Sequence, residues 1–280
     1  MTAIAPWLGA FLREHLPGER RASSHTCAAY ADAFRLLLCF AARKLETAPS
    51  SIELEQLEAP LVLAFLQHLE DERGNSAKTR NARLAAINAF FRFLEYRLPS
   101  CIDQARRIHA LPVKKTDDRL INYLTREEVQ VLLDTPDATT VAGVRDHAML
   151  HLAFAAGLRV SELVGLELQD LRIRPYPQIH VQGKGRRERL LPLWKVTMTS
   201  LRRWLAVRRD GHATALFLNA GGEAMTRSGF RYILAKHVET AARHHPSLAD
   251  KNVSPHVLRH SCAMHTLHAT HDVRKVSLWL

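Results

Sequence analysis

Cysteine is scarce in this 280-residue sequence, and its distribution excludes two common kinds of site. There are four cysteines, and no two of them form a C-x-x-C pair. Zinc ribbons and thioredoxin-like redox motifs both need such pairs, so neither is expected here. We interpret the cysteines as reduced, partly buried thiols, and they are Cys27, Cys39, Cys101 and Cys262.

Long apolar runs and a leader-like N-terminus are also missing. Residues 1–20 lack the basic stretch followed by a clean apolar one that a secretory signal requires. The most apolar run, residues 36–42, lies between Arg35 and Arg43 and is far shorter than a bilayer-spanning helix. These features predict a soluble, cytoplasmic protein with no membrane partner.

Acidic residues are outnumbered by basic ones. The sequence has 28 Asp and Glu against 39 Lys and Arg, a formal net charge of +11. Such a balance favours a polyanionic partner, with nucleic acid first and an anionic membrane surface second. Because 47% of the residues are hydrophobic and only 12 are Gly and 12 Pro, the chain is not of low complexity, and its length suits two ordinary domains.

The first hundred residues have the apolar spacing of a helical bundle. Over residues 26–45 apolar side chains recur at helical intervals, with charged ones between them. A second helix follows Pro60, and a third runs from about Ser76 until Pro99 stops it. We therefore predict a helical domain over residues 4–98.

Beyond the bundle the periodicity fades, and a connection is expected over residues 99–117. The second domain, residues 118–280, has a capping-box sequence at residues 125–128. Two short β-type segments, residues 178–181 and 189–193, flank a glycine-rich turn and predict a β-hairpin. The rest of this half has helical spacing. The predicted fold class is therefore mainly α with a small β-sheet, a helical bundle followed by an α+β domain.

The first chemically informative motif is Gly157-Leu-Arg-Val-Ser-Glu162. Gly157 can end one helix in a left-handed cap, and Ser161 can begin the next. Arg159 then lies at the start of a helix, where anions bind favourably. Taken alone, the more ordinary explanation is an ion pair between Arg159 and Glu162 on a solvated turn.

A basic cluster around the expected hairpin turn is the second feature. Lys184 is flanked by two glycines, which permit tight geometry and close approach to a ligand. Nine Lys and Arg residues within residues 183–209 are accompanied by one acid, Glu188. A solvated edge strand is the alternative, but the length of the cluster favours phosphate contacts. Arg186 and Arg187 are the expected contacts beside the turn.

The third feature is His256-Val-Leu-Arg259-His260, which follows a Ser-Pro helix start. His256 and Arg259 are three residues apart, so on a helix they share a face and can converge on one ligand. An ordinary surface pair is the alternative. Further histidines nearby could indicate a metal site, but no H-E-x-x-H order or cysteine partner supports one, and no metal is expected.

In this order, the three motifs resemble the signature of the tyrosine recombinase, or phage integrase, family. The N-terminal bundle is similar to that family's core-binding, SAM-like domain, so the resemblance covers nearly the whole chain. It implies a catalytic domain of tyrosine-recombinase type over residues 118–280 and a C-shaped clamp of both domains around double-stranded DNA. It also implies DNA recombination and integration, as in mobile elements, by a homo-oligomer that forms a tetrameric synapse on DNA.

The resemblance implies that a tyrosine attacks a DNA phosphodiester, giving a 3′-phosphotyrosyl link and a free 5′-hydroxyl that later reseals the strand. Arg159 and Arg259 would hold the non-bridging oxygens, and no cofactor would be needed. Lys184 would be the general acid for the leaving 5′-oxygen, assisted by His256. Glu162 would orient the site from behind the residues that touch the substrate.

DNA contacts are also expected in the first domain, at the start of its third helix. A basic helix start can reach a groove or a phosphate. A solvated helix end is the alternative. The expected contacts are Lys78, Thr79, Arg80 and Arg83.

One part of the family pattern is missing. In the family a Gly-His pair and the nucleophilic tyrosine follow the last apolar helix, whereas this sequence stops at Leu280 without them. All five tyrosines precede His256, and Tyr232 is the nearest of them. We therefore expect a chain truncated before its nucleophile, incomplete in its catalytic domain and inactive in cleavage by itself.

The leading hypothesis is a site-specific recombinase whose complete form cleaves and rejoins DNA strands. A catalytically dead DNA-binding remnant, or an inhibitor of intact recombinases, is the alternative. A metal-dependent nuclease is a third class, but it would need a carboxylate cluster able to hold Mg²⁺, and none stands out in the sequence.

Overall fold

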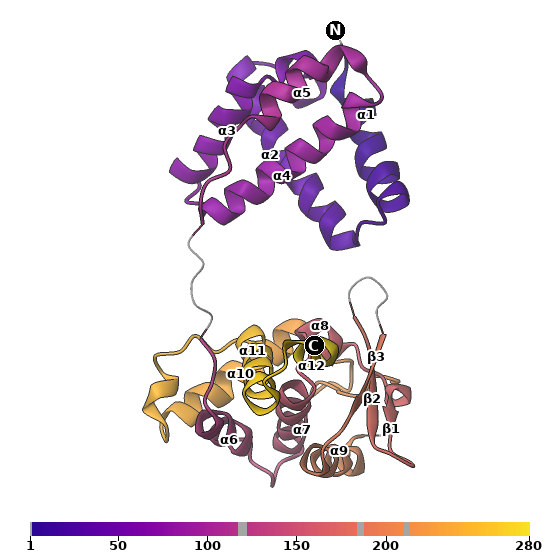
Figure 1. Cartoon of the computed structure of the whole chain (residues 1–280), viewed down its shortest axis with the longest axis vertical. Helices are drawn as coiled ribbons and strands as arrows, with labels where there is room; N and C mark the ends of the chain where they lie inside the picture. Colours follow the sequence, from indigo (N-terminus) through magenta and orange to yellow (C-terminus); the bar gives the residue numbers. More distant parts are fainter. Residues whose placement is uncertain (1, 117–121, 184–187, 210–212) are drawn as a thin grey trace. The chain divides into compact units, whose positions relative to one another are not determined.

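Two separate hydrophobic cores, one from each half of the sequence, organise the chain. The computed structural model describes residues 2–116, 122–183, 188–209 and 213–280. The chain divides into two units, Met1–Asp118 and Arg119–Leu280 (Figure 1). Because each unit has its own core, each is described by itself.

The first unit is a helical bundle whose helix limits follow from local signals. Ser23 and Ser76 each accept a hydrogen bond from the backbone N–H three residues further on, at Thr26 and Thr79. These bonds satisfy donors that the first turn of a helix leaves free. Glu46, in the left-handed region with φ 52°, ends α2. The helices are α1 (Ile4–Ala10), the π-helix η1 (Phe11–Glu19), α2 (Ser24–Leu45), α3 (Ala59–Asp71), α4 (Ala77–Glu95) and α5 (Ile102–His109), with 3₁₀ turns η2 (Pro49–Ser51), η3 (Leu54–Gln56) and η4 (Pro99–Cys101).

An aromatic cluster fills the centre of this bundle. The ring centroid of Phe11 lies 6.2 Å from that of Phe34 and 5.4 Å from those of Phe90 and Phe93. All four rings are almost fully buried. Burial of a ring of this size contributes roughly 1.5–3 kcal/mol. The cluster therefore holds η1, α2 and α4 together.

The three predicted helices of the bundle are confirmed as α2, α3 and α4. The expected connection over residues 99–117 contains a further helix, α5. Ala105 and Ile108 of α5 are completely buried in the first core. A helix this short is marginal without packing, so its formation depends on the core rather than on a long sequence period.

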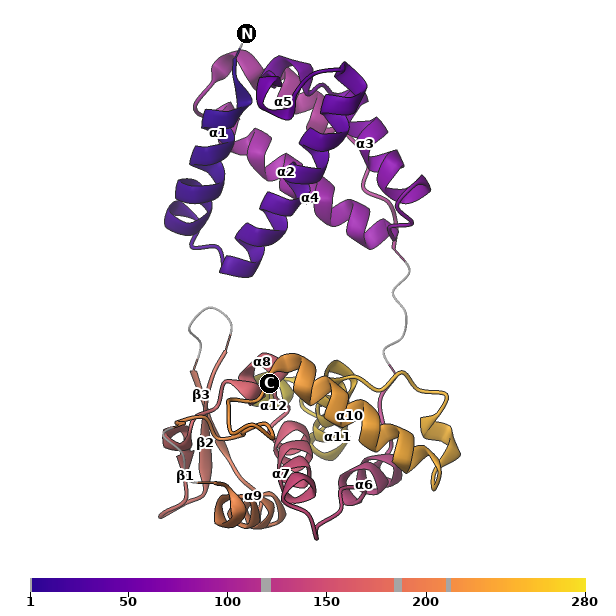
Figure 2. The same cartoon turned by 180° about the vertical axis from the view of Figure 1, so that it is seen from behind.

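The second unit packs a small antiparallel sheet against a set of helices. In both views β1, β2 and β3 stand at one edge of the unit, and α7 lies between the sheet and α6 (Figures 1 and 2). Its elements are α6 (Arg126–Asp134), α7 (Val141–Ala155), α8 (Val160–Val164), η5 (Leu168–Asp170), β1 (Leu171–Arg172), β2 (Gln178–Gln182), β3 (Glu188–Pro192), α9 (Lys195–Val207), α10 (Arg227–Ala242), η6 (Pro246–Leu248), α11 (Pro255–Thr270) and α12 (Val273–Trp279).

The sheet has the order β1-β2-β3, and its register sets which residues face the core. Ile179 pairs with Leu191, and Val181 pairs with Arg189. Ile179, Val181 and Leu191 are buried on the inner face. The predicted hairpin is thus confirmed, while its turn, residues 184–187, lies outside the described residues.

Two local predictions in the second unit are also confirmed. Thr125 and Glu128 form a reciprocal capping box at the start of α6, with bonds of 2.7 and 3.2 Å. The helix expected before Gly157 is α7. Among the described residues, none of the helices combines the length and apolar content that crossing a bilayer requires.

A buried polar network joins α10 to α7. Asp146 is 2% exposed; it accepts hydrogen bonds from Arg145 at 2.7 and 3.0 Å and lies 3.0 Å from Nε2 of His237. Arg145 also donates to the carbonyl oxygen of Leu218 at 3.2 Å. These contacts neutralise a carboxylate that would otherwise be costly to bury.

A buried histidine on α7 has no such support. His151 is 7% exposed, and its Nε2 has no hydrogen-bond partner among the described residues. Its ring lies 4.3 Å from that of His147. Burial, reinforced by His147, lowers the pKa of His151 to about 4. The folded unit therefore holds this imidazole neutral.

We predict that His151 makes the second unit acid-labile. Its folded pKa lies below the unfolded value of about 6.5, so its contribution to stability is full above pH 6.5 and is lost as the pH falls toward 4. Between pH 7.5 and 5 the loss is on the order of 2 kcal/mol. His151→Leu should remove about that much of the pH dependence, measured by urea unfolding at both pH values. The exposed His244→Leu is the control. Equal pH dependence in the wild type and His151→Leu would contradict the prediction.

Candidate active site

Arg159 is fixed by the turn between α7 and α8. Gly157 has φ +56°, and a Cβ at this position would collide with the Leu280 side chain and approach Cys262. This conformation is one that glycine adopts readily. It turns the chain so that Arg159 is the N-cap of α8, where its backbone N–H donates to Glu162 at 2.9 Å.

Arg259 and His256 come from the start of α11. The Ser254 side chain accepts a hydrogen bond from Val257 N, and Pro255 occupies the first turn, where a missing N–H has no cost. His256 is exposed and Arg259 is 9% exposed. The two side chains therefore lie on one face of α11 at different depths.

The carboxylate of Glu162 joins the arginines of this region. Its side chain is 3% exposed, and Oε1 lies 2.7 Å from Nη1 of Arg159. Oε2 lies 2.9 Å from Nη2 of Arg189 on β3 and 3.6 Å from Nη1 of Arg259. Three guanidinium groups from three elements thus share one buried carboxylate.

Arg259 is held on its other side by backbone oxygens. Its Nη1 donates to the carbonyl of Gly157, and its Nη2 donates to a main-chain oxygen of Leu280, the last residue of the sequence. Burial, followed by repulsion from Arg159, lowers the pKa of Arg259 to about 10, although Glu162 acts in the opposite direction. Arg259 therefore remains cationic at neutral pH, and a bound anion would be stabilised by it.

Two cavities are both lined by Arg159 and Arg259. The first, about 560 Å³, is lined by Arg159, His256 and Arg259, together with Arg231 of α10. The second, about 1050 Å³, is lined by Arg159, Arg189 and Arg259. The side chain of Arg159 is 48% exposed, and it lines both cavities. Guanidinium groups arranged in this way can bind a tetrahedral oxyanion through fixed N–H donors.

The structure brings three of the four predicted catalytic residues together: Arg159, His256 and Arg259. Lys184, Arg186 and Arg187 lie outside the described residues. Two arginines of the cavities were not singled out as site residues. Arg189 could have been found, because it interrupts the apolar inner face of β3, whereas no pattern marks Arg231.

In the first unit, two of the four expected DNA contacts are committed to the fold. Arg80 is 2% exposed and donates to the carbonyl of Pro112 at 2.6 Å. Arg83 donates to the carbonyl of Ala29 and pairs with Asp32 of α2. Neither guanidinium is available to a phosphate in this arrangement, so we correct the expectation for both. Lys78 is exposed and Thr79 is partly exposed.

No tyrosine of the chain, all five being described, lines either arginine cavity. Tyr96, Tyr176 and Tyr232 are 88%, 75% and 73% exposed. Tyr123 lies against histidines of α11 instead. Within the described part of the chain, no group of three or more His, Cys, Asp and Glu side chains is placed to hold a metal ion.

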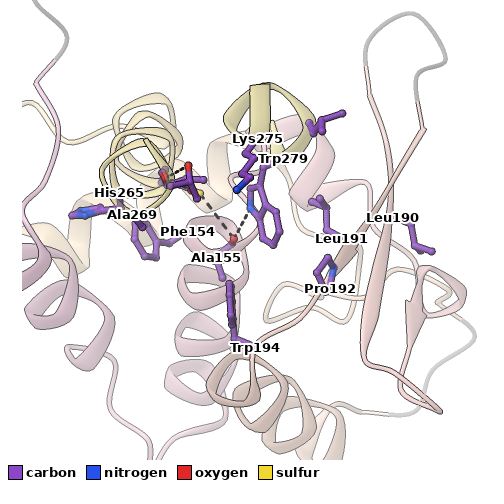
Figure 3. A pocket seen from close by; sticks show the side chains of 14 residues that line it. Phe154, Ala155, Leu190, Leu191, Pro192, Trp194, His265, Ala269, Lys275 and Trp279 are labelled. Carbon is purple, nitrogen blue, oxygen red and sulfur yellow. Dashed lines mark hydrogen bonds between the residues drawn. The ribbon is translucent and has the colours of Figure 1, made fainter. Parts of the chain in front are cut away.

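An apolar cavity of about 660 Å³ adjoins the arginine site between α7, β3, α11 and α12 (Figure 3). Trp279 donates from its indole nitrogen to the carbonyl of Ala155 at 3.0 Å, and its ring lies 6.2 Å from that of Trp194. Trp194, Leu190 and Leu278 are 61%, 48% and 78% exposed. Large apolar side chains exposed together are typical of surfaces that bind another protein or a ligand.

Residues 122–280 match the family model described as "Phage integrase family", and residues 10–97 match "Phage integrase, N-terminal SAM-like domain". The first match alone covers more than half of the chain. The chain therefore belongs to the phage integrase family.

Two relatives are similar in sequence to this chain over most of their own length. The y4rC integrase/recombinase of Sinorhizobium fredii is 43% identical over 278 residues, which are 99% of this chain and 84% of that protein. Tyrosine recombinase XerC of Pelobacter propionicus is 34% identical over 265 residues, covering 94% of this chain and 83% of that protein.

Solved structures share the fold. The Tn1549 transposon integrase in complex with circular intermediate DNA has a TM-score of 0.74 at 18% identity, over 100% of this chain and 91% of that one. The XerH recombinase bound to its difH substrate has a TM-score of 0.67 at 21% identity, over 96% and 76%. A lambda integrase tetramer bound to a Holliday junction has a TM-score of 0.70 at 14% identity, over 100% and 77%. At these identities the likeness shows the fold, mainly helical with a small sheet.

We predict that Glu162→Gln destabilises the second unit by about 3 kcal/mol, because it leaves the buried charges of Arg189 and Arg259 without their shared counterion. The measurement is urea unfolding followed by tryptophan fluorescence; Trp204 lies in the second core. Glu239→Gln is a matched control, since Glu239 is exposed and pairs with Arg243 only at 3.5 Å; it should change stability by less than about 0.5 kcal/mol. Similar effects of both substitutions would show that Glu162 is not a structural counterion.

Proposed function

We propose that this protein is a site-specific DNA recombinase, or integrase, that binds duplex DNA and that in a complete form cleaves and rejoins strands through a 3′-phosphotyrosyl intermediate. The observation that carries the proposal is the convergence of Arg159, His256 and Arg259 on one cavity in a member of the phage integrase family. The recombinase names of the relatives support it.

In this proposal the arginine pair binds the scissile phosphate. Arg159 and Arg259 donate to its non-bridging oxygens and stabilise the charge that develops on them when a tyrosine oxygen attacks phosphorus. The bond from phosphorus to the 5′-oxygen breaks, and that oxygen takes a proton, for which Lys184 is the proposed donor and His256 the assisting group. Glu162 holds both arginines in place.

The proposed partner is double-stranded DNA, held by a homo-oligomer. Two solved structures of the same fold contain DNA: XerH recombinase bound to its difH substrate, and a lambda integrase tetramer bound to a Holliday junction. The apolar cavity of Figure 3 supports self-association, since its exposed Trp194 and Leu278 suit a face that a second copy of this chain covers. The proposed location is the cytoplasm, in association with DNA.

The first unit is proposed to bind DNA as a core-binding domain. Lys78 and Thr79, at the start of α4, are the remaining proposed contacts there, and Arg186 and Arg187 are those proposed beside Lys184. A catalytically dead remnant that blocks intact recombinases would use the same DNA-binding surfaces. No observation favours that alternative over the recombinase.

We predict that the affinity for duplex DNA falls steeply with salt, because each phosphate contact releases condensed counterions. A protein with six or more phosphate contacts should lose on the order of 10³ in affinity between 50 and 200 mM salt. Fluorescence anisotropy across a salt series measures this. Arg159→Ala should reduce the slope by about one contact. An affinity that is flat with salt would rule out the nucleic-acid partner.

We also predict that the 280-residue chain binds DNA but forms no covalent adduct with it, because none of its five tyrosines lines the arginine cavities. The test incubates the protein with nicked duplexes carrying its recombination site and looks for a DNA-linked protein band on a denaturing gel. A band mapped to Tyr232 or to another tyrosine of the chain would overturn this account of the site.

A further inference from the structure

Arg189 occupies a core-facing position in the sheet. It pairs with Val181, next to the pair of Leu191 with Ile179, and those three partners are buried on the inner face. The Arg189 side chain is 14% exposed, whereas its neighbours in β3, Glu188 and Leu190, are exposed. An alternating strand normally places an apolar residue there, and such departures concentrate at functional sites.

The buried charge of Arg189 is balanced by Glu162 of α8. Its Nη2 donates to Oε2 of Glu162 at 2.9 Å, across 27 positions of sequence. Its Nε is buried with no hydrogen-bond partner among the described residues. Among the described residues, one ion pair positions this guanidinium, and it joins β3 to the helix that begins at Arg159.

The charge balance gives this ion pair a consequence for anion binding. Glu162 faces Arg159, Arg189 and Arg259, so three guanidinium groups share one side-chain carboxylate. If Arg189 were absent, the carboxylate would be free to pair more closely with Arg259, which now lies 3.6 Å away. A carboxylate that approaches Arg259 competes with an anion for the same N–H donors.

We propose that Arg189 is a positioning residue of the anion site: by engaging Glu162 it keeps the carboxylate from pairing more closely with Arg259, so that phosphate can compete for the guanidinium N–H donors, and it ties the β2–β3 hairpin to Arg159 and Arg259. The proposal rests on the proposed function, because it assumes that the arginine cavities take a phosphate. Arg189 acts through Glu162 and not by contact with the anion.

The first test measures inorganic phosphate binding to the whole chain by NMR of the arginine Nε–H signals. Arg189→Ala should weaken binding about ten-fold. Arg189→Met keeps the apolar stem that packs in the sheet and should weaken it equally, which separates charge from folding. Arg189→Lys should recover part of the affinity, since it restores the charge without the planar fork. The exposed Arg202→Ala is the control and should bind like the wild type. Wild-type affinity in Arg189→Met would overturn the proposal.

A double-mutant cycle with Glu162→Gln provides the second test, under conditions in which all variants are folded. Because Arg189 is proposed to act through the carboxylate, Arg189→Met should change phosphate affinity by less than about two-fold once Glu162 is Gln. An undiminished ten-fold loss in that background would overturn the proposal, since Arg189 would then act on phosphate directly.

Binding of phosphate and duplex DNA to the wild-type chain distinguishes a failure of the proposed function from a failure of the role of Arg189. If the wild-type chain bound neither phosphate nor duplex DNA, the recombinase proposal itself would fall. If it bound both and Arg189→Met left phosphate affinity unchanged, only the role of Arg189 would be wrong.

Discussion

The buried carboxylate of Glu162 is the group on which the arginine site depends. It accepts hydrogen bonds from the backbone N–H and the guanidinium of Arg159 and from the guanidinium of Arg189. It also lies 3.6 Å from Nη1 of Arg259. These partners belong to α8, β3 and α11, which are distant in sequence. One buried side-chain carboxylate therefore helps to position three guanidinium groups from different elements. This clustering of guanidinium groups around one carboxylate supports the proposal that the cavity binds an anion.

The backbone around this carboxylate supplies the rest of the arrangement. Gly157 adopts a left-handed conformation, which lets α7 end and Arg159 begin α8 within a few residues. The carbonyl of the same glycine accepts a hydrogen bond from Arg259. Arg259 is thereby fixed on two sides, and burial lowers its pKa to about 10 without making it neutral at physiological pH. Rigid donors of this kind stabilise developing charge without having to reorganise during a reaction.

The sequence predicted the helices and the hairpin because the signals for them are local. The capping box of Thr125 and Glu128 acts within one turn, so the start of α6 could be placed from residue order alone, as could the start of α4 near Ser76. Arg80 shows the limit of such reasoning. As a basic residue at a helix start it was expected to contact DNA, yet it is buried against the carbonyl of Pro112, 32 positions away. Whether an arginine meets solvent or a backbone oxygen depends on long-range packing, which sequence spacing does not contain.

The sequence by itself determined the family motifs, the helical bundle, the hairpin and the residue types able to bind a phosphate. The tertiary structure decided which of these residues meet. Arg159 and Arg259 are 100 positions apart, and only the packing of α11 against α7 brings both to one cavity. The tertiary structure also places Arg189 on the core face, because the strand register pairs it with Val181. A charge buried there needs a counterion, which Glu162 provides. Composition and spacing fix which charges are present, but their partners depend on contacts between elements far apart in the chain.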